Sequence, residues 1–353
     1  MGVALARAER ERRSERERCA RERRFGLLAH ERLGDGLRRI ALSQLEVAIG
    51  ALREQGDGTP QQRVHETRKA LKRLRALLRL LRAQLGETAY ERDSAVLRDA
   101  GKRLARARDA QVLLSTLDEL IAHNPRRLGK RGGVRRLRAR LQSESDGAAA
   151  LMLSDGATRL DTLAQLSALR SRVEDWELTD VAGFAAVEPA LAALYRQGRR
   201  RLRRAERAKR DLNGRKLHEW RKRVKDLRYA AEILRREDDG EHTRKRGGGK
   251  SARRKAKQAR RQAAFIGVVA ERADELGELL GEEHDLAVLA ARVRVEAKRG
   301  GAAALGARSR KALLKAISKR RARLRKRALR DGSRLYRRRP KKFAVRVRRA
   351  AAR

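Results

Sequence analysis

The stretch His65-Glu-Thr-Arg-Lys-Ala-Leu-Lys-Arg-Leu-Arg75 decides the fold, because it recurs later in the chain as His218-Glu-Trp-Arg-Lys-Arg-Val-Lys-Asp-Leu-Arg228. The two segments align without a gap and are identical at seven of eleven positions. Their apolar residues are spaced three and four residues apart, which is typical of an amphipathic helix. A duplicated helix of this kind indicates an internal repeat.

A second pair of segments follows the first pair in the same order. Leu104–Leu113 matches Leu280–Leu289, so that Asp109 corresponds to Asp285. The offset between the copies is 153 at the histidines (218 − 65) and 176 at the aspartates (285 − 109). The second half therefore carries 23 additional residues (176 − 153), and the glycine- and lysine-rich segment 237–261 accounts for them.

Basic residues form a stripe beside the apolar seam of each duplicated helix. Residues spaced by three or four lie on one face of a helix and rise by roughly 5 Å per turn. A linear polyanion lying along the helix would meet a new cation at each turn, and we predict that the stripes bind one. The stripes contain His65, Arg68, Lys72, Arg75, Arg79 and Arg82 in the first copy, and His218, Arg221, Lys225 and Arg228 in the second.

The composition of the chain also favours a polyanionic partner. Its 353 residues include 93 Lys and Arg against 45 Asp and Glu, which gives a formal net charge of +48. Such an excess repels itself unless an anion offsets it. Aromatic residues make up only 3%, which argues against binding by base stacking. The single cysteine, Cys19, permits no internal disulfide, and no apolar run is long enough to span a membrane, so we expect a cytoplasmic protein.

The remaining sequence predicts an all-α protein, because helical periodicity dominates and alternating β patterns are absent. Thr59-Pro60 is typical of an N-cap followed by proline at the first helical position. We expect a charged N-terminal tail over 1–24, a mobile basic loop over 237–261 and a basic C-terminal tail over 331–353. The N-terminal run is equally compatible with a solvated helix.

Together, the paired histidine helices and the Arg108-Asp109 and His284-Asp285 blocks resemble the CHAD domain, the conserved-histidine α-helical domain. The resemblance covers about residues 25–330, with halves at about 25–180 and 181–330. It implies two helical bundles related by pseudo-two-fold symmetry around a basic groove, which bind inorganic polyphosphate and are targeted to polyphosphate granules. The implied phosphate contacts are His65, Arg68, Lys69, Lys72 and Arg75 in one half, and His218, Arg221, Lys222, Lys225 and Arg228 in the other.

Several other motifs in the sequence have simpler structural explanations. A metal site is not expected, because His65 and Glu66 are adjacent on a helix and do not face each other. Asp109 and Asp285 are interpreted as structural anchors rather than catalytic acids. Gly249-Lys250-Ser251 lacks the earlier glycine and the strand that a phosphate-binding loop requires. Candidate groove-wall residues, with a solvated face as the alternative, are Arg199, Arg203, Lys319 and Arg323.

The sequence thus predicts a non-enzymatic polyphosphate-binding protein without a cofactor, and leaves its oligomeric state open. A first alternative is non-specific binding of nucleic acid through the tails and the basic loop. A second is an enzyme that hydrolyses or transfers phosphate, using the histidines and aspartates of the repeated blocks.

Overall fold

A computed structural model describes residues 25–28, 31–53, 59–154, 156–178, 183–208, 214–237, 250–296 and 305–351. These residues are almost entirely helical, as the periodicity predicts. The exception is a parallel pairing of two short strands, β1 (Leu27–Leu28) and β2 (Arg236–Glu237). The predicted N-terminal tail, 1–24, lies outside the described residues.

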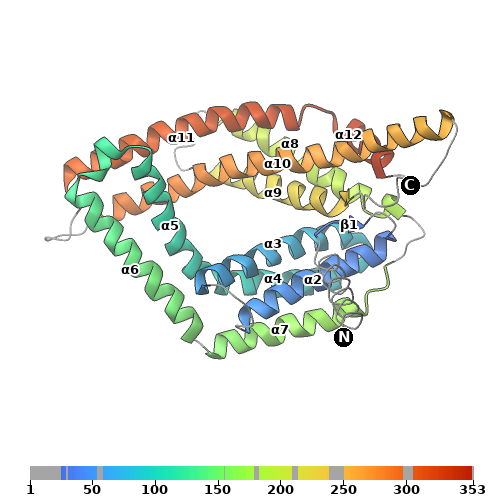
Figure 1. Ribbon diagram of the computed structural model, residues 1–353, viewed down its shortest axis with the longest axis horizontal. Coiled ribbons are helices and arrows are strands. Elements are labelled where there is room, and N and C mark those ends of the chain that lie inside the picture. Colours follow the sequence, from blue (N-terminus) through green and yellow to red (C-terminus); the bar gives the residue numbers. More distant parts are fainter. Residues whose placement is uncertain are drawn as a thin grey trace, which may run out of the picture.

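The helices form two layers joined at one end (Figure 1). The lower layer contains α2 (Leu33–Leu52), α3 (Pro60–Leu85), α4 (Glu87–Arg103) and α7 (Gly156–Glu174). The upper layer contains α8 (Glu188–Glu206), α9 (Arg215–Leu234), α10 (Lys250–Glu296), α11 (Ala307–Leu335) and α12 (Pro340–Ala351). The connection at the left-hand end consists of α5 (Ala105–Ala122), the π-helical turn η1 (Pro125–Gly129) and α6 (Gly132–Ser154). A 3-10 turn, η2 (Gly183–Ala186), precedes α8.

Helix α3 begins where the sequence predicts. Thr59 and Gln62 form a capping box, in which the Gln62 backbone N–H donates to the Thr59 hydroxyl and the Thr59 N–H donates to the Gln62 side chain. Pro60 occupies the first helical position, where its missing N–H costs nothing. The predicted start of this helix is confirmed.

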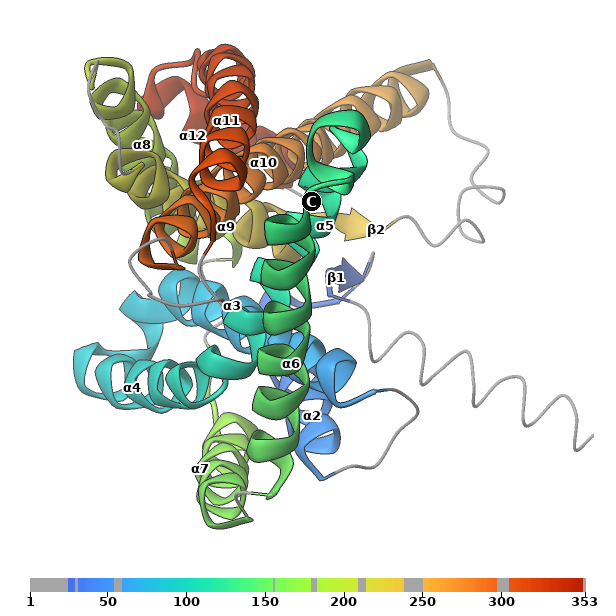
Figure 2. The same cartoon turned by 90° about the vertical axis from the view of Figure 1, so that its left-hand side faces the viewer.

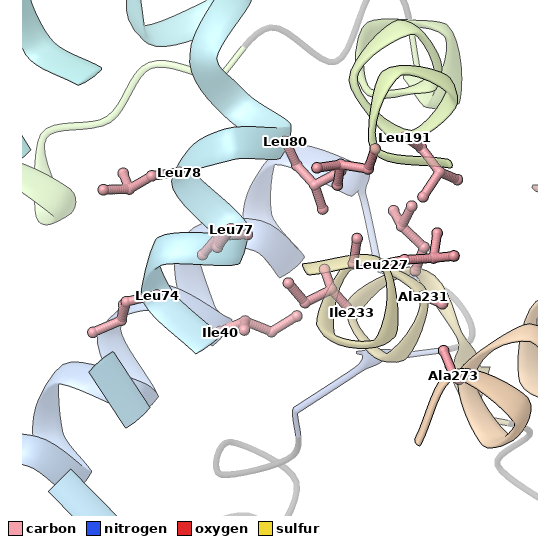
Figure 3. Close-up of a cluster of buried hydrophobic side chains, with 14 of the residues drawn as sticks. Ile40, Leu74, Leu77, Leu78, Leu80, Leu191, Leu227, Ala231, Ile233 and Ala273 are labelled. Atoms are coloured by element: carbon pink, nitrogen blue, oxygen red, sulfur yellow. The ribbon is translucent and has the colours of Figure 1, made fainter. Parts of the chain in front are cut away.

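The two duplicated helices meet in the core. Leu77 and Leu80 of α3 and Leu227 and Ile233 of α9 are at most 1% exposed and lie in the same cluster of apolar side chains (Figure 3). This cluster includes buried residues from both halves of the chain, from α2 at one end of the sequence to α12 at the other. The boundary expected at residue 180 therefore does not divide the core into two separate parts.

The hairpin of α5 and α6 packs against the other half of the chain. Leu117 of α5 and Leu141 of α6 share a second buried cluster with Leu289 of α10 and Ile317 of α11. Ion pairs reinforce this packing, from Arg140 of α6 to Glu296 of α10 and from Arg292 of α10 to Glu144 of α6. In Figure 2, α5 and α6 lie in front of both layers, so the first half of the sequence completes the core of the second.

Two predictions about flexible segments are wrong in part. The expected loop 237–261 includes residues 238–249, which lie outside the described residues, but from Lys250 onward the chain is helical. The expected C-terminal tail continues α11 and then forms α12, whose Phe343 and Val347 are 2% and 1% exposed. Phe343 and Val347 are four residues apart and lie on one face of a helix. The many charged residues around them led to the prediction of a tail.

Candidate polyanion-binding site

Glycines position the start of α9. Gly214 precedes the helix with φ +70°, a left-handed conformation that glycine adopts readily, and a Cβ there would lie 2.9 Å from Nη2 of Arg321. Trp220 is fully buried, and its ring packs onto Gly332 of α11, where a Cβ would lie 2.4 Å from two ring carbons. These contacts fix the rotation of α9 about its axis.

With α9 held in this orientation, His218 faces His284 of α10. The two ring centroids are 4.1 Å apart and the planes are inclined by 33°. Burial, together with the neighbouring His218, Arg221, Lys222 and Arg321, lowers the pKa of His284 to about 4. Burial and the charges of Lys222 and Arg221 also lower the pKa of His218. Both rings are therefore neutral near pH 7, and Nδ1 of His218 is buried without a hydrogen-bond partner in the described part of the chain.

Arg221 and Lys225 continue this stripe over two glycines of α10. A Cβ at Gly281 would lie 3.5 Å from Nη2 of Arg221, and one at Gly277 would lie 3.9 Å from Lys225. Burial and the neighbouring Arg221 lower the pKa of Lys225 to about 8. Nε of Arg221 is buried and has no hydrogen-bond partner among the residues described. Partly buried cations whose N–H donors lack hydrogen-bond partners favour the binding of an anion.

The first copy places its stripe in a similar way on α3. Nη1 of Arg68 donates to the carbonyl of Gly101 at 3.1 Å, which ties the stripe to the end of α4. His65 and Lys72 are exposed, whereas Arg75 is half-buried. Burial and the charges of Arg79 and Arg98 lower the pKa of Arg75, so this guanidinium lies in positive surroundings.

Lys69 and Lys222 each form an ion pair within their own helix. Nζ of Lys69 lies 3.6 Å from Glu66, and Nζ of Lys222 lies 2.8 Å from Glu219. Exposed pairs of this spacing contribute only a few tenths of a kcal/mol. Both lysines can therefore turn toward an incoming phosphate at little cost.

Arg79, Arg228 and Arg82 have structural partners that the sequence prediction did not anticipate. Nη1 of Arg79 lies 2.7 Å from Asp226, so this pair links α3 to α9. Arg228 pairs with Glu232 at 2.6 Å and with Asp274. Carboxylates already balance these guanidinium groups, which favours a structural role for both residues; their role as phosphate contacts stays a prediction. Arg82 pairs with Glu87 through side chains that are 55% and 52% exposed.

Helices α3, α9, α10 and α5 form a closed ring of contacts, in which each packs against the next and α5 returns to α3. In Figure 1, α3 and α9 both begin at the left-hand end, where α5 crosses between the layers. The histidine ends of the two stripes therefore occur at the same end of the molecule. The internal duplication itself remains a prediction from the sequence.

The candidate groove-wall residues lie elsewhere. Nε of Arg199 donates to the carbonyl of Tyr336 at 3.1 Å, and Arg199 and Arg203 line a cavity of about 330 Å³ on α8. Lys319 and Arg323 are exposed on α11. A larger cavity of about 920 Å³, which the sequence prediction missed, lies between α8 and α9 and is lined by Arg201, Arg204, Arg207, Arg215, Lys216 and Glu219. The run of arginines in α8 could have indicated an anion-binding surface. The cavity itself could not be predicted, because it depends on the packing of α8 beside α9.

The acidic and histidine residues of the repeated blocks do not form a metal centre in the described ranges, since no group of three or more suitable ligands occurs there. Glu283, one position before His284, is 1% exposed and pairs with Arg321 and Arg325 at 2.8 Å each. This buried carboxylate holds α10 to α11. Asp109 is exposed and Asp285 is half-buried. Their role as structural anchors stays a prediction.

The model of the CHAD domain matches residues 38–246, which include both duplicated helices. The chain belongs to the CHAD family. The fold is also similar to the crystal structure of the CHAD domain from the plant Ricinus communis, with a TM-score of 0.48 and 20% identity over 85% of this chain and 87% of that one. A comparison with curated proteins found no match. No helix in the described part of this CHAD chain is both long and apolar enough to cross a membrane.

Proposed function

We propose that this CHAD protein binds inorganic polyphosphate along the stripes of α3 and α9, without cleaving it, and that it resides at polyphosphate granules in the cytoplasm. The observation that carries the proposal is the half-buried set of Arg221, Lys225 and His218, in which Nε of Arg221 and Nδ1 of His218 are buried without a hydrogen-bond partner among the described residues and burial lowers the pKa of Lys225 to about 8. Membership of the CHAD family supports a polyphosphate-related role.

The residue types in the stripes suit a uniform polymer. Arginine binds a phosphate through two parallel hydrogen bonds, whereas lysine acts as a point charge. A row that mixes the two can hold a repeating anion in several registers. The best-supported contacts are Arg68, Lys69, Lys72 and Arg75 on α3, and His218, Arg221, Lys222 and Lys225 on α9.

The proposal is tested by measuring the affinity of long-chain polyphosphate for the double variant Arg68→Glu/Arg221→Glu. We expect a loss of at least tenfold, because two attractive contacts become repulsive. Arg126→Glu/Arg127→Glu, on exposed residues of η1, removes the same charge and should change the affinity much less. Equal losses in the two variants would show that net charge alone drives binding.

Because Arg68 and Arg221 are half-buried, a milder variant guards against misfolding. Lys69→Gln/Lys222→Gln alters side chains that are 39% and 48% exposed, so the melting temperature should stay unchanged while affinity falls several-fold. Unchanged affinity in this variant and in Arg68→Glu/Arg221→Glu would place the site elsewhere.

Nucleic acid is the second candidate ligand, favoured by the net charge of +48. Competition separates the two ligands. Polyphosphate should remain bound when double-stranded DNA is added in excess at comparable phosphate concentration, because the stripes contact a flexible chain without a second strand. Displacement by DNA would favour non-specific nucleic-acid binding.

A further inference from the structure

Helix α8 and its C-cap residue carry a dense set of arginines that form few ion pairs with the described residues. Residues 196–207 contain seven arginines and no lysine. Three of them, Arg201, Arg204 and Arg207, follow a spacing of three along the C-terminal half of the helix. None of these three makes an ion pair with a residue that the structure describes. Like charges at this spacing repel each other by a few tenths of a kcal/mol per pair.

Among the described residues, two acidic side chains lie next to this set, and both also have partners outside α8. Oε1 of Glu206 accepts a hydrogen bond from the Ser333 hydroxyl of α11 at 3.2 Å. Glu219 of α9 lies 2.8 Å from Nζ of Lys222, and this pairing lowers the pKa of the Glu219 carboxyl. Glu219 also interacts electrostatically with Arg201, but neither carboxylate forms an ion pair with Arg201, Arg204 or Arg207, in contrast to Asp226, which pairs with Arg79.

The surface is concave where α8 approaches the beginning of α9. Five of the six residues lining the cavity of about 920 Å³ are cationic, and the sixth is Glu219. Its volume falls in the range of roughly 300–1,000 Å³ that is usual for small-molecule sites. Arg204 and Arg207 also line the adjoining cavity of about 330 Å³, so these two residues border both cavities.

We propose that the larger cavity is a second anion-binding site, which takes a compact ligand with several linked phosphates, such as tripolyphosphate or a nucleoside triphosphate. Guanidinium groups on two neighbouring helices can grip different phosphates of one short ligand bidentately. None of the described residues that line the cavity is aromatic, so the ligand is recognised by its phosphates and not by a base. Tripolyphosphate and ATP should consequently bind with similar affinity, and orthophosphate much more weakly.

This site is distinct from the stripe of α9. Arg215, Lys216 and Glu219 line the cavity, whereas His218, Arg221 and Lys225 face α10. The pair Lys222–Glu219 stands between the two faces. A ligand in the cavity therefore contacts cations that the stripe does not use.

Calorimetric titration of the full chain with tripolyphosphate tests this proposal. In Arg201→Gln/Arg204→Gln/Arg207→Gln we expect the dissociation constant to rise at least tenfold. The control Arg126→Gln/Arg127→Gln/Arg135→Gln removes the same number of exposed or half-exposed arginines from η1 and α6, and should change it less than threefold. Equal weakening in both would overturn the proposal in favour of bulk charge.

The stripe variant Arg68→Glu/Arg221→Glu separates this site from the proposed polyphosphate site. It should keep most of its affinity for tripolyphosphate, while the α8 variant should keep most of its affinity for long-chain polyphosphate. Loss of tripolyphosphate binding in the stripe variant, with retention in the α8 variant, would contradict the second site. Melting curves of all variants verify that they are folded.

Discussion

At the scale of single residues, Arg79 shows that membership of a basic stripe does not determine a role. Its guanidinium lies 2.7 Å from Asp226, and both side chains are mostly buried, at 21% and 12% exposure. Arg223 approaches the same carboxylate at 3.3 Å, so Asp226 keeps one cation when Arg79 is removed.

Arg79→Met should therefore lower the free energy of unfolding by about 1–3 kcal/mol, because it leaves a partly buried carboxylate less well compensated. The affinity for polyphosphate of the folded variant should hardly change. Denaturant unfolding and a binding titration measure the two quantities. Arg82→Met, at a pair whose side chains are more than half exposed, should lower the free energy of unfolding much less than Arg79→Met does. A large loss of affinity in Arg79→Met at unchanged stability would restore Arg79 as a phosphate contact.

His284 predicts a pH dependence of stability. Its pKa in the folded chain is about 4, below the ordinary value of 6.5, so between these pH values the unfolded chain binds more protons than the folded one. The contribution of neutral His284 to the free energy of unfolding is therefore complete above about pH 6.5 and is lost as the pH falls toward 4. His284→Asn should flatten this dependence by on the order of 1 kcal/mol, allowing for the partial exposure of the ring. Unfolding curves at pH 7 and pH 5 for both proteins measure it, and parallel pH profiles would contradict the assignment.

At the scale of helices, close packing rests on glycines that face large side chains. Gly332 of α11 receives the Trp220 ring, and there is no room for a methyl group between them. By contrast, a Cβ at Gly147 of α6 would have no other atom within 4 Å.

Gly332→Ala should destabilise the protein by about 1–3 kcal/mol, since the rigid ring has to move. Gly147→Ala should instead stabilise it by up to about 1 kcal/mol, because alanine favours the helix. Thermal melts of the two variants should thus shift in opposite directions. If Gly332→Ala melted at or above the temperature of the unaltered protein, the packing of α9 on α11 would have to be looser than described.

Sequence periodicity was sufficient for α3 and α9, because each has a regular apolar seam and α3 carries a clear capping box. It was not sufficient for α12, where five of the twelve residues are arginine or lysine, or for the start of α10, where arginines and lysines outnumber the apolar residues. For the site, spacing identified the face that carries Arg68 and Arg221. It could not identify Asp226 as the partner of Arg79, because 147 residues separate the two in the sequence and only the packing of α3 on α9 joins them.

At the scale of the whole molecule, the continuous core predicts cooperative unfolding. The two tryptophans lie on opposite sides of the expected boundary, Trp176 after α7 and Trp220 in α9, yet both belong to the same cluster. Single-domain cores usually unfold in one transition, which different probes report identically.

Single-tryptophan variants test this expectation. In Trp176→Phe the remaining fluorescence reports on Trp220, and in Trp220→Phe it reports on Trp176. Within each variant the fluorescence and far-ultraviolet circular dichroism transitions in urea should have the same midpoint. Fluorescence midpoints that precede or follow the loss of helix would show that the two halves unfold as separate bundles.

The hairpin of α5 and α6 has a consequence for synthesis on the ribosome. Leu141 of α6 is made 176 residues before Ile317 of α11, its companion in the second core cluster (317 − 141). At roughly 5–20 residues per second, translation takes about 10–35 s to cover that distance. During this interval the residues of α11 that complete the second cluster have not yet been made, so we expect part of the apolar side of the hairpin to stay uncovered until they emerge.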